Sequence, residues 1–180
     1  METRERQLWW RHLLSFLVAP VTMTLVIPAV IVVGAGVRAP DLSSAAGIGL
    51  ATVGGLLIAL GSGLLIWTVA LFDRVGKGTL GVGRVLGEPV HLVVRGPYRH
   101  VRNPMISGVV CILLGEAAIA ASGWLLLWAA IFFAFLATFI RFWEEPHLVK
   151  RYGREYVDYR RNVPAWIPRI SAWTAGESRR

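Results

Sequence analysis

The chain has 180 residues, enough for one compact unit, and 55% of them are apolar while only 17% are charged. Soluble domains carry about 25% charged residues, so the composition indicates a membrane protein. The formal net charge is +8, but the basic residues flank apolar runs and do not lie on a polar domain, so we expect no nucleic-acid partner. A single cysteine excludes an internal disulfide, and the four histidines lack metal-ligand spacing, so we expect no metal site.

The first apolar run covers residues 13–37 and follows three arginines, as a signal peptide would. It is longer than the 7–15 apolar residues of a signal peptide, and no small-residue cleavage site follows it. We therefore predict a transmembrane helix over approximately 13–37. Pro20 and Pro28 should kink it, and neighbouring helices can supply the hydrogen bonds that proline removes.

A polar break at 38–47 precedes the second apolar run, for which we predict a transmembrane helix over 48–72. Small residues recur every four positions in it. Such a face lets membrane helices pack closely, although a cofactor contact along it is an alternative. The residues of this face are Ala51, Gly55, Ala59 and Gly63.

A glycine-rich basic loop over 73–104 follows, and then two apolar runs over 105–121 and 124–142. The short turn between these runs predicts an antiparallel helical hairpin. Aromatic residues at both ends of the last run fit the two membrane interfaces. They are Trp124, Trp128, Phe142 and Trp143.

The tail over 143–180 is polar and basic, yet apolar residues recur in it every three to four positions. This spacing predicts one amphipathic helix that lies on the membrane surface or closes over a site. Pro164 and Pro168 should end it. The apolar stripe consists of Leu148, Tyr152, Tyr156, Tyr159 and Val163.

These elements predict an all-α fold, a single polytopic membrane domain over 1–180 with four transmembrane helices and a cytosolic C-terminal amphipathic helix. An even number of crossings places both termini on the side of the long loop. Eighteen of the nineteen Lys and Arg residues then lie on that side, and Arg38 lies on the other. The positive-inside rule makes the basic side cytoplasmic.

Three groups of polar residues stand out. The loop over 95–104 has three arginines within eight residues, which suits either a binding site or a loop that only sets topology and contacts headgroups. Glu144 and Glu145 lie beside an anionic leaflet, which is unfavourable unless they face cations, although a solvated charge pair is the alternative. Glu116 is an intramembrane carboxylate, with either a functional or a paired structural role.

Residues 76–81 match G-x-G-x-x-G, but no strand precedes them, so a Rossmann site is not indicated. The loop instead resembles the G-P-Y-R-x-x-R-[HN]-P-M-Y-x-G signature of membrane methyltransferases. The tail resembles their E-E-x-x-L-x-x-x-[FY]-G-x-x-Y-x-x-Y…P…P signature. The resemblance covers roughly 76–170 and is to the isoprenylcysteine carboxyl methyltransferases, the phospholipid methyltransferases and their prokaryotic relatives. Ile106 stands where that family usually has Tyr, and Asn103 replaces the commoner His.

The resemblance implies that S-adenosylmethionine binds on the cytosolic side, in a protein of a prokaryotic inner membrane. A lipid-like or isoprenoid substrate would enter from the bilayer, among membrane lipids. By position, Arg102 and Glu144 match catalytic residues of that family. The residues that match its cofactor site are Tyr98, Arg102, Asn103, Pro104 and Glu145, and more loosely Gly76 and Gly78.

The cofactor's charges agree with this assignment. Glu144 or Glu145 could hold its cationic end, and Arg102 could hold its carboxylate through a bidentate pair. In-line methyl transfer depends largely on positioning, so the lack of a catalytic triad is no objection. Two alternatives remain. Sterol reductases that use NADPH share part of these motifs, and a non-enzymatic helical membrane subunit could use the basic loop only to bind headgroups.

Overall fold

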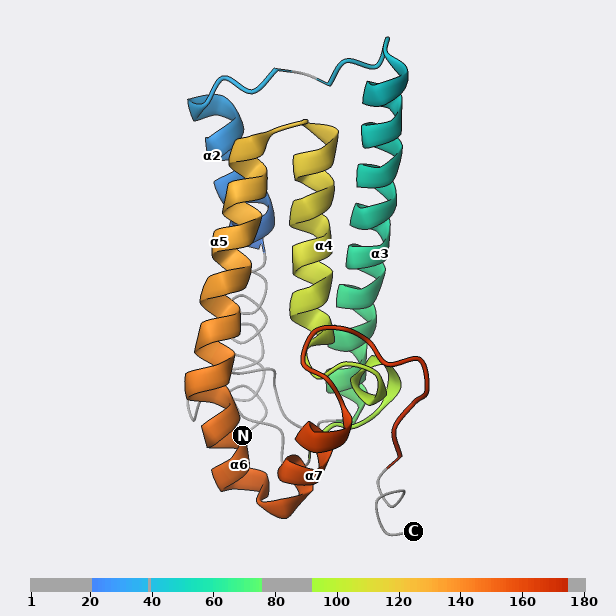
Figure 1. The fold of residues 1–180 in the computed structure, drawn as a ribbon, viewed down its shortest axis with the longest axis vertical. Coiled ribbons are helices and arrows are strands. Elements are labelled where there is room, and N and C mark those ends of the chain that lie inside the picture. Colours follow the sequence, from blue (N-terminus) through green and yellow to red (C-terminus); the bar gives the residue numbers. More distant parts are fainter. Residues whose placement is uncertain (1–20, 39, 76–91, 175–180) are drawn as a thin grey trace, which may run out of the picture.

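The computed structural model describes residues 21–38, 40–75 and 92–174, and in these ranges the chain is helical without strands. Helical columns stand side by side (Figure 1). They are η1 and α2 (Thr22–Val26 and Ile27–Gly34), α3 (Ala45–Val75), α4 (Pro104–Ile119) and α5 (Gly123–Phe139).

Two helical stretches, Ala45–Leu71 and Gly123–Tyr152, are long and apolar enough to cross a hydrocarbon core of about 30 Å. Thr22–Gly34 and Pro104–Ile119 are apolar but shorter. Within the described ranges, length and composition therefore support two of the four predicted crossings. Residues 13–20 of the first predicted helix lie outside those ranges.

The first helix shows how a neighbour repairs a proline defect, as predicted. The chain is in π-helical register over Thr22–Val26, where the Ile27 amide donates to the Thr22 carbonyl. The next amide in that register would belong to Pro28, which has none. The Met23 carbonyl instead accepts a hydrogen bond of 3.2 Å from the indole Nε1 of Trp128 on α5. This helix ends at Gly34, three residues before the predicted boundary.

Helices α3 and α4 pack through glycines that are seven residues apart. An added Cβ at Gly61 would lie 2.5 Å from the Gly108 carbonyl oxygen, and one at Gly54 would lie 2.6 Å from that of Gly115. Both glycine pairs therefore permit close backbone contact.

The predicted small-residue face is not the face through which α3 packs within the described chain. Gly55 and Gly63 have open space where a Cβ would stand, and Ala59 is exposed. Residues that recur every four positions move progressively around a helix, whereas residues that recur every seven positions stay on one side of it. Helix α3 also begins at Ala45, before the predicted start, because the Ser44 hydroxyl caps it by accepting from the Gly47 amide at 3.1 Å.

The hairpin of α4 and α5 is as predicted, and the Ser122 hydroxyl caps α5 by accepting from the Leu125 amide at 3.4 Å. The predicted end at residue 142 is wrong. The helix continues through a π-helical turn, η3 (Ile140–Glu144), into α6 (Glu145–Tyr152). Pro146 is tolerated because it stands in the first turn of α6, directly after the change of register.

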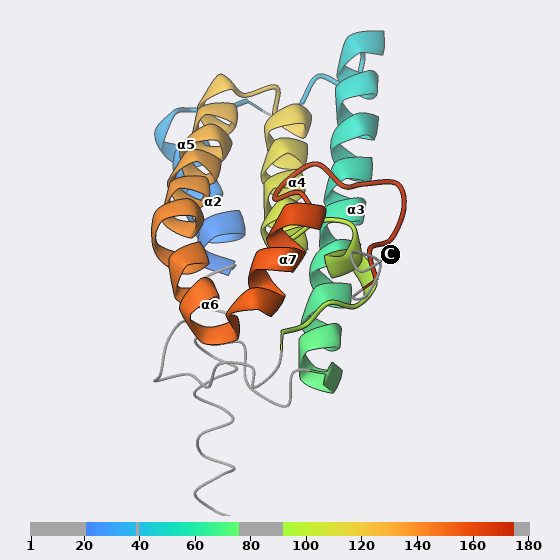
Figure 2. The same ribbon diagram turned by 60° about the horizontal axis from the view of Figure 1, so that its bottom comes forward.

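The tail forms two helices, not the single predicted one. Gly153 has φ +57°, which breaks the helix between α6 and α7 (Arg154–Asn162). Figure 2 shows the two helices meeting at an angle at one end of the bundle. The predicted apolar stripe nevertheless packs together. Tyr156, Tyr159 and Val163 form a buried cluster with Trp173, and Leu148 and Tyr152 pack against it.

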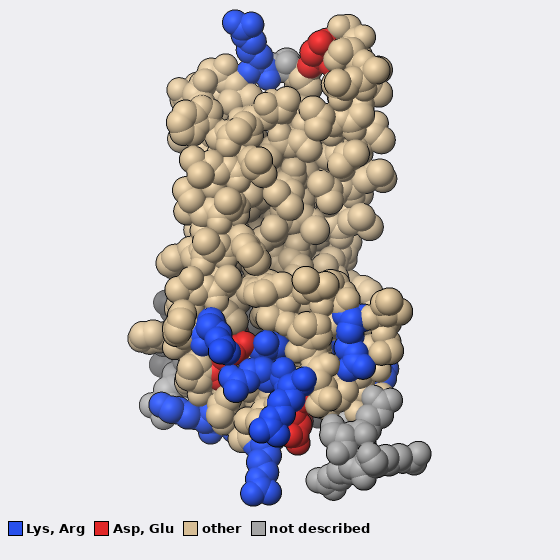
Figure 3. Space-filling view, in the orientation of Figure 1, with Lys and Arg blue, Asp and Glu red and all other residues tan. Residues whose placement is uncertain are grey.

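Basic side chains gather at the end of the bundle where α6 and α7 lie, and the long middle of the molecule is free of surface charge in this view (Figure 3). The connection between α2 and α3, at the opposite end in Figure 1, carries Arg38 and Asp41. Helices α6 and α7 thus mark the polar end of an apolar bundle.

Candidate functional site

The loop before α4 is held against α3 at Gly96. Residues Gly96–Arg99 form a short 3₁₀ helix, η2, in which Pro97 and Tyr98 are buried. Gly96 has φ +53°, and an added Cβ would meet the Trp67 ring at 3.4 Å. Glycine is therefore favoured here by the backbone conformation, while the space beside it would accept a Cβ at ordinary contact distance.

The C-terminal tail runs along this loop and pairs with its backbone. The Arg102 amide donates to the Pro164 carbonyl at 2.9 Å, the Arg169 amide to the His100 carbonyl at 3.0 Å, and the Trp173 amide to the Arg99 carbonyl at 3.0 Å. Segments about 60 to 75 residues apart in sequence thus form one unit.

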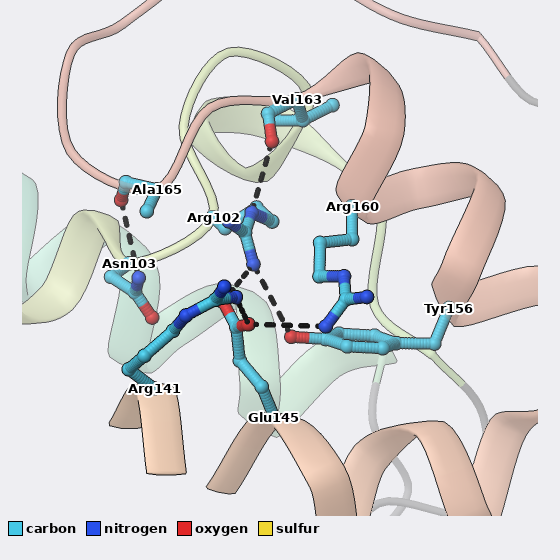
Figure 4. Close-up of polar contacts among 8 residues, drawn as sticks. All are labelled: Arg102, Asn103, Arg141, Glu145, Tyr156, Arg160, Val163 and Ala165. Atoms are coloured by element: carbon cyan, nitrogen blue, oxygen red, sulfur yellow. Dashed lines mark hydrogen bonds and ion pairs between the residues drawn. The ribbon is translucent and has the colours of Figure 1, made fainter. Parts of the chain in front are cut away.

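At the centre of this unit, one buried carboxylate meets three arginines (Figure 4). Glu145, whose side chain is 3% exposed, pairs through Oε1 with Nη1 of Arg102. Its Oε2 lies 3.1 Å from Nη1 of Arg141 and 3.3 Å from Nη1 of Arg160. The three arginines come from the loop, from η3 and from α7. The cluster therefore has two more positive charges than negative ones.

Arg102 is almost as buried as Glu145, with 11% of its side chain exposed. Its Nε donates to the Val163 carbonyl at 2.9 Å, and Nη1 lies 3.5 Å from the Tyr156 hydroxyl. A buried ion pair is stable only when further hydrogen bonds satisfy its remaining donors and acceptors, and these contacts supply them.

Asn103 and Pro104 connect this cluster to α4. The Asn103 amide Nδ2 donates to the Ala165 carbonyl at 3.2 Å. Pro104 is the first residue of α4, where its fixed φ suits the helix and its missing N–H costs nothing, and it is fully buried. Both residues therefore fix the direction in which α4 leaves the site.

Three buried tyrosines surround the cluster. The Tyr159 hydroxyl donates to the Tyr98 carbonyl at 2.7 Å. Burial raises the pKa of Tyr98 above its usual range, and the charges of Tyr159 and Glu144 add to that shift. Burial likewise raises the pKa of Tyr156 and of Tyr159. All three hydroxyls therefore stay protonated at neutral pH.

The structure brings Arg102, Asn103, Pro104 and Glu145 together, with Tyr98 held beside them through Tyr159. Glu144 is exposed and close enough to raise the pKa of Tyr98 and Tyr156. Gly76 and Gly78 lie outside the described residues. Glu116 stands twelve positions along α4 from Pro104, about 18 Å away at 1.5 Å per residue, and is not part of this cluster.

Two residues of the cluster were missed from the sequence. Arg141 lies four residues before Glu145, a helical spacing that pairs opposite charges and could have indicated it. Arg160 lies fifteen residues after Glu145 and beyond the break at Gly153, so no local spacing indicated it.

The family model for phospholipid methyltransferase matches residues 50–155, more than half of the chain. The chain belongs to the phospholipid methyltransferase family. The matched segment runs from α3 into α7 and includes both Arg102 and Glu145. Comparison with curated proteins and with solved structures gave no match.

Proposed function

We propose that this protein transfers a methyl group from S-adenosylmethionine to a lipid-like or isoprenoid substrate at the cytosolic face of a prokaryotic inner membrane. The observation that carries the proposal is the meeting of two motifs within the segment matched by the phospholipid methyltransferase family. Arg102 and Glu145, 43 residues apart, form one buried ion pair at the polar end of an apolar bundle.

The proposal includes four membrane crossings, with η1 and α2, α3, α4 and α5 as the spans. Helices α4 and α5 are antiparallel and share one short turn. With both termini cytosolic, the basic end of Figure 3 faces the cytosol, in agreement with the positive-inside rule. The site then lies where a water-soluble cofactor can meet a substrate that dissolves in the bilayer.

The residues of the cluster fit the charges of S-adenosylmethionine. Arg141 and Arg160 have side chains that are 65% and 37% exposed, and the cluster's positive surplus suits the cofactor's carboxylate. Glu144 is exposed nearby and suits its cationic end. Because Arg102 already pairs with Glu145, we assign that pair to positioning the loop and α6. Arg102 could bind the cofactor's carboxylate in a bidentate manner, as expected from the sequence, only if its pair with Glu145 opened.

S-adenosylmethionine, when bound, supplies an electrophilic methyl group. The protein's own contribution is to hold the reactants in line and to exclude water, and positioning of this kind can supply about 7–11 kcal/mol of the barrier. A carboxylate substrate needs no base, and an amine needs only its neutral form. Tyr98, Tyr156 and Tyr159 stay neutral, so they place no negative charge there that would compete with Glu144 for the cationic end of the cofactor.

The test is a calorimetric titration of the detergent-solubilised protein with S-adenosylhomocysteine. Wild type should bind, and Arg102→Ala and Glu145→Ala should each abolish binding. Arg154→Ala, an exposed change on the same tail, is the matched control and should bind normally. If both site variants bind like wild type, the assignment is wrong. Binding of NADPH in place of S-adenosylhomocysteine would favour the reductase alternative.

The substrate class requires a separate assay. Radiolabelled S-adenosylmethionine incubated with the protein and a total lipid extract should give labelled product, and separation by lipid class identifies the acceptor. Incorporation that is lost in Glu145→Ala and kept in Arg154→Ala would tie the activity to this site. No label in any lipid class would contradict a lipid substrate.

A further inference from the structure

A second polar feature lies in the other half of the bundle and takes no part in the proposed reaction. A cavity of about 260 Å³ opens between η1, α2, α3, α4 and α5. Its lining is apolar, with residues such as Leu25, Val32, Ile58 and Leu125, and Glu116 is the one charged residue among the described residues that line it. Leu25 and Ala29 line it and are also exposed, so the cavity opens through the outer face of the first helix.

The carboxylate of Glu116 is incompletely satisfied. Its Oε2 is buried and has no hydrogen-bond partner among the described residues. The sequences of η1, α2, α4 and α5 contain no Lys, Arg or His. The basic residue of α3, Arg74, is sixteen positions from Ile58, about 24 Å along the helix. A carboxylate in an apolar setting costs free energy unless a partner satisfies it, and such residues in membrane proteins mark ligand sites.

We propose that this cavity binds the amine headgroup of a long-chain amphiphile from the bilayer, with Glu116 as its partner. A primary amine satisfies the carboxyl group wherever the shared proton resides, because the pair is either ammonium with carboxylate or amine with carboxylic acid. The apolar lining accepts the first methylenes of the chain, and the opening past Leu25 and Ala29 lets the remainder lie along the first helix. Two other headgroups offer only part of this interaction. An alcohol offers a hydrogen-bond donor without charge, and a quaternary ammonium offers charge without a hydrogen-bond donor.

The site is distinct from the arginine cluster. Glu116 and Pro104 are twelve positions apart on α4, so about 18 Å separates this carboxylate from the loop that carries Arg102. Amine binding can therefore be measured without any cofactor, and its outcome does not depend on methyl transfer.

The probe is hexadecylamine, added to the full chain in a non-ionic detergent at pH 7, with binding followed by native mass spectrometry and by the thermal unfolding midpoint. Wild type should bind one molecule and gain thermal stability. Glu116→Gln should weaken binding at least tenfold. Ala29→Phe, which adds a bulky side chain at a residue that lines the cavity, should weaken it similarly. Glu155→Gln, an exposed carboxylate on α7, is the matched control and should bind like wild type.

Two results would overturn the proposal. One is that wild type and Glu116→Gln bind hexadecylamine equally well. The other is that wild type binds hexadecanol or hexadecyltrimethylammonium as tightly as hexadecylamine, which would indicate that burial of the chain or charge alone drives binding. S-adenosylhomocysteine binding by both cavity variants shows that the cluster is intact. Loss of both ligands by both variants would be a third contradicting result, because the two sites would then not be separate.

Discussion

The carboxylate of Glu145 and the guanidinium of Arg102 form an ion pair in which both side chains are buried, at 3% and 11% exposure. Replacing Glu145 by Gln removes the only acidic partner of three neighbouring guanidinium groups described at this site. Breaking a buried pair by removing one partner costs about 3–5 kcal/mol. We expect Glu145→Gln to lower the thermal unfolding midpoint of the detergent-solubilised protein markedly.

Arg141→Ala is the matched comparison for that change. Its guanidinium contacts the same carboxylate, but 65% of its side chain is exposed. Exposed pairs contribute about 0.2–1 kcal/mol, so its loss should lower the midpoint only slightly. Equal effects of Arg141→Ala and Glu145→Gln would show that burial does not set the strength of this cluster.

The hydrogen bond from the Tyr159 hydroxyl to the Tyr98 carbonyl joins α7 to the loop. Tyr159→Phe leaves a buried carbonyl without this donor, which costs about 1–3 kcal/mol. Tyr156→Phe should cost less, because its hydroxyl lies 3.5 Å from Arg102 and the ring stays in the same cluster. Thermal unfolding midpoints of the two variants test this order. A larger fall of the midpoint for Tyr156→Phe than for Tyr159→Phe would contradict the importance assigned to the Tyr159 hydroxyl.

The three buried tyrosines predict a loss of stability at high pH. The unfolded chain ionises tyrosine near pH 10, whereas burial raises the pKa of Tyr98, Tyr156 and Tyr159 in the folded protein. Their contribution is therefore complete below pH 10 and declines as pH rises above it, because the unfolded state then binds fewer protons. Tyrosinate absorbance at 295 nm should show these three tyrosines ionising late and together with unfolding. Ionisation of all three near pH 10 in the folded protein would contradict burial.

The apolar runs predicted the helices because apolar periodicity is a local property, and the resemblance to the family's motifs implied that loop and tail meet. It did not predict the path of the tail. The break at Gly153 depends on a positive φ, which glycine permits but does not require. Pro146 does not end the helix, because the change to π register places it in a tolerated first turn.

The sequence indicated Arg102 and Glu145 of the candidate site, but it missed Arg141, Arg160 and the backbone partners. Arg102 and Glu145 were assigned to the site by their positions in the family's motifs, and they form a pair. The carbonyls of Val163 and Ala165, which accept from Arg102 and Asn103, carry no sequence signal because every residue has a carbonyl.

The contact between α3 and α4 gives a final prediction, in which two glycines of one helix respond oppositely. A Cβ at Gly61 would lie 2.5 Å from the Gly108 carbonyl oxygen, a backbone atom that cannot rotate away. Gly61→Ala must therefore separate the helices, and overpacking of this kind costs about 1–3 kcal/mol. Gly63→Ala meets open space and removes a flexible glycine from a helix, so it should be neutral or raise stability by up to about 1 kcal/mol. Unfolding midpoints measured side by side should fall for Gly61→Ala alone. A fall for Gly63→Ala instead would place the contact on the other face of α3, where four-residue spacing had suggested it.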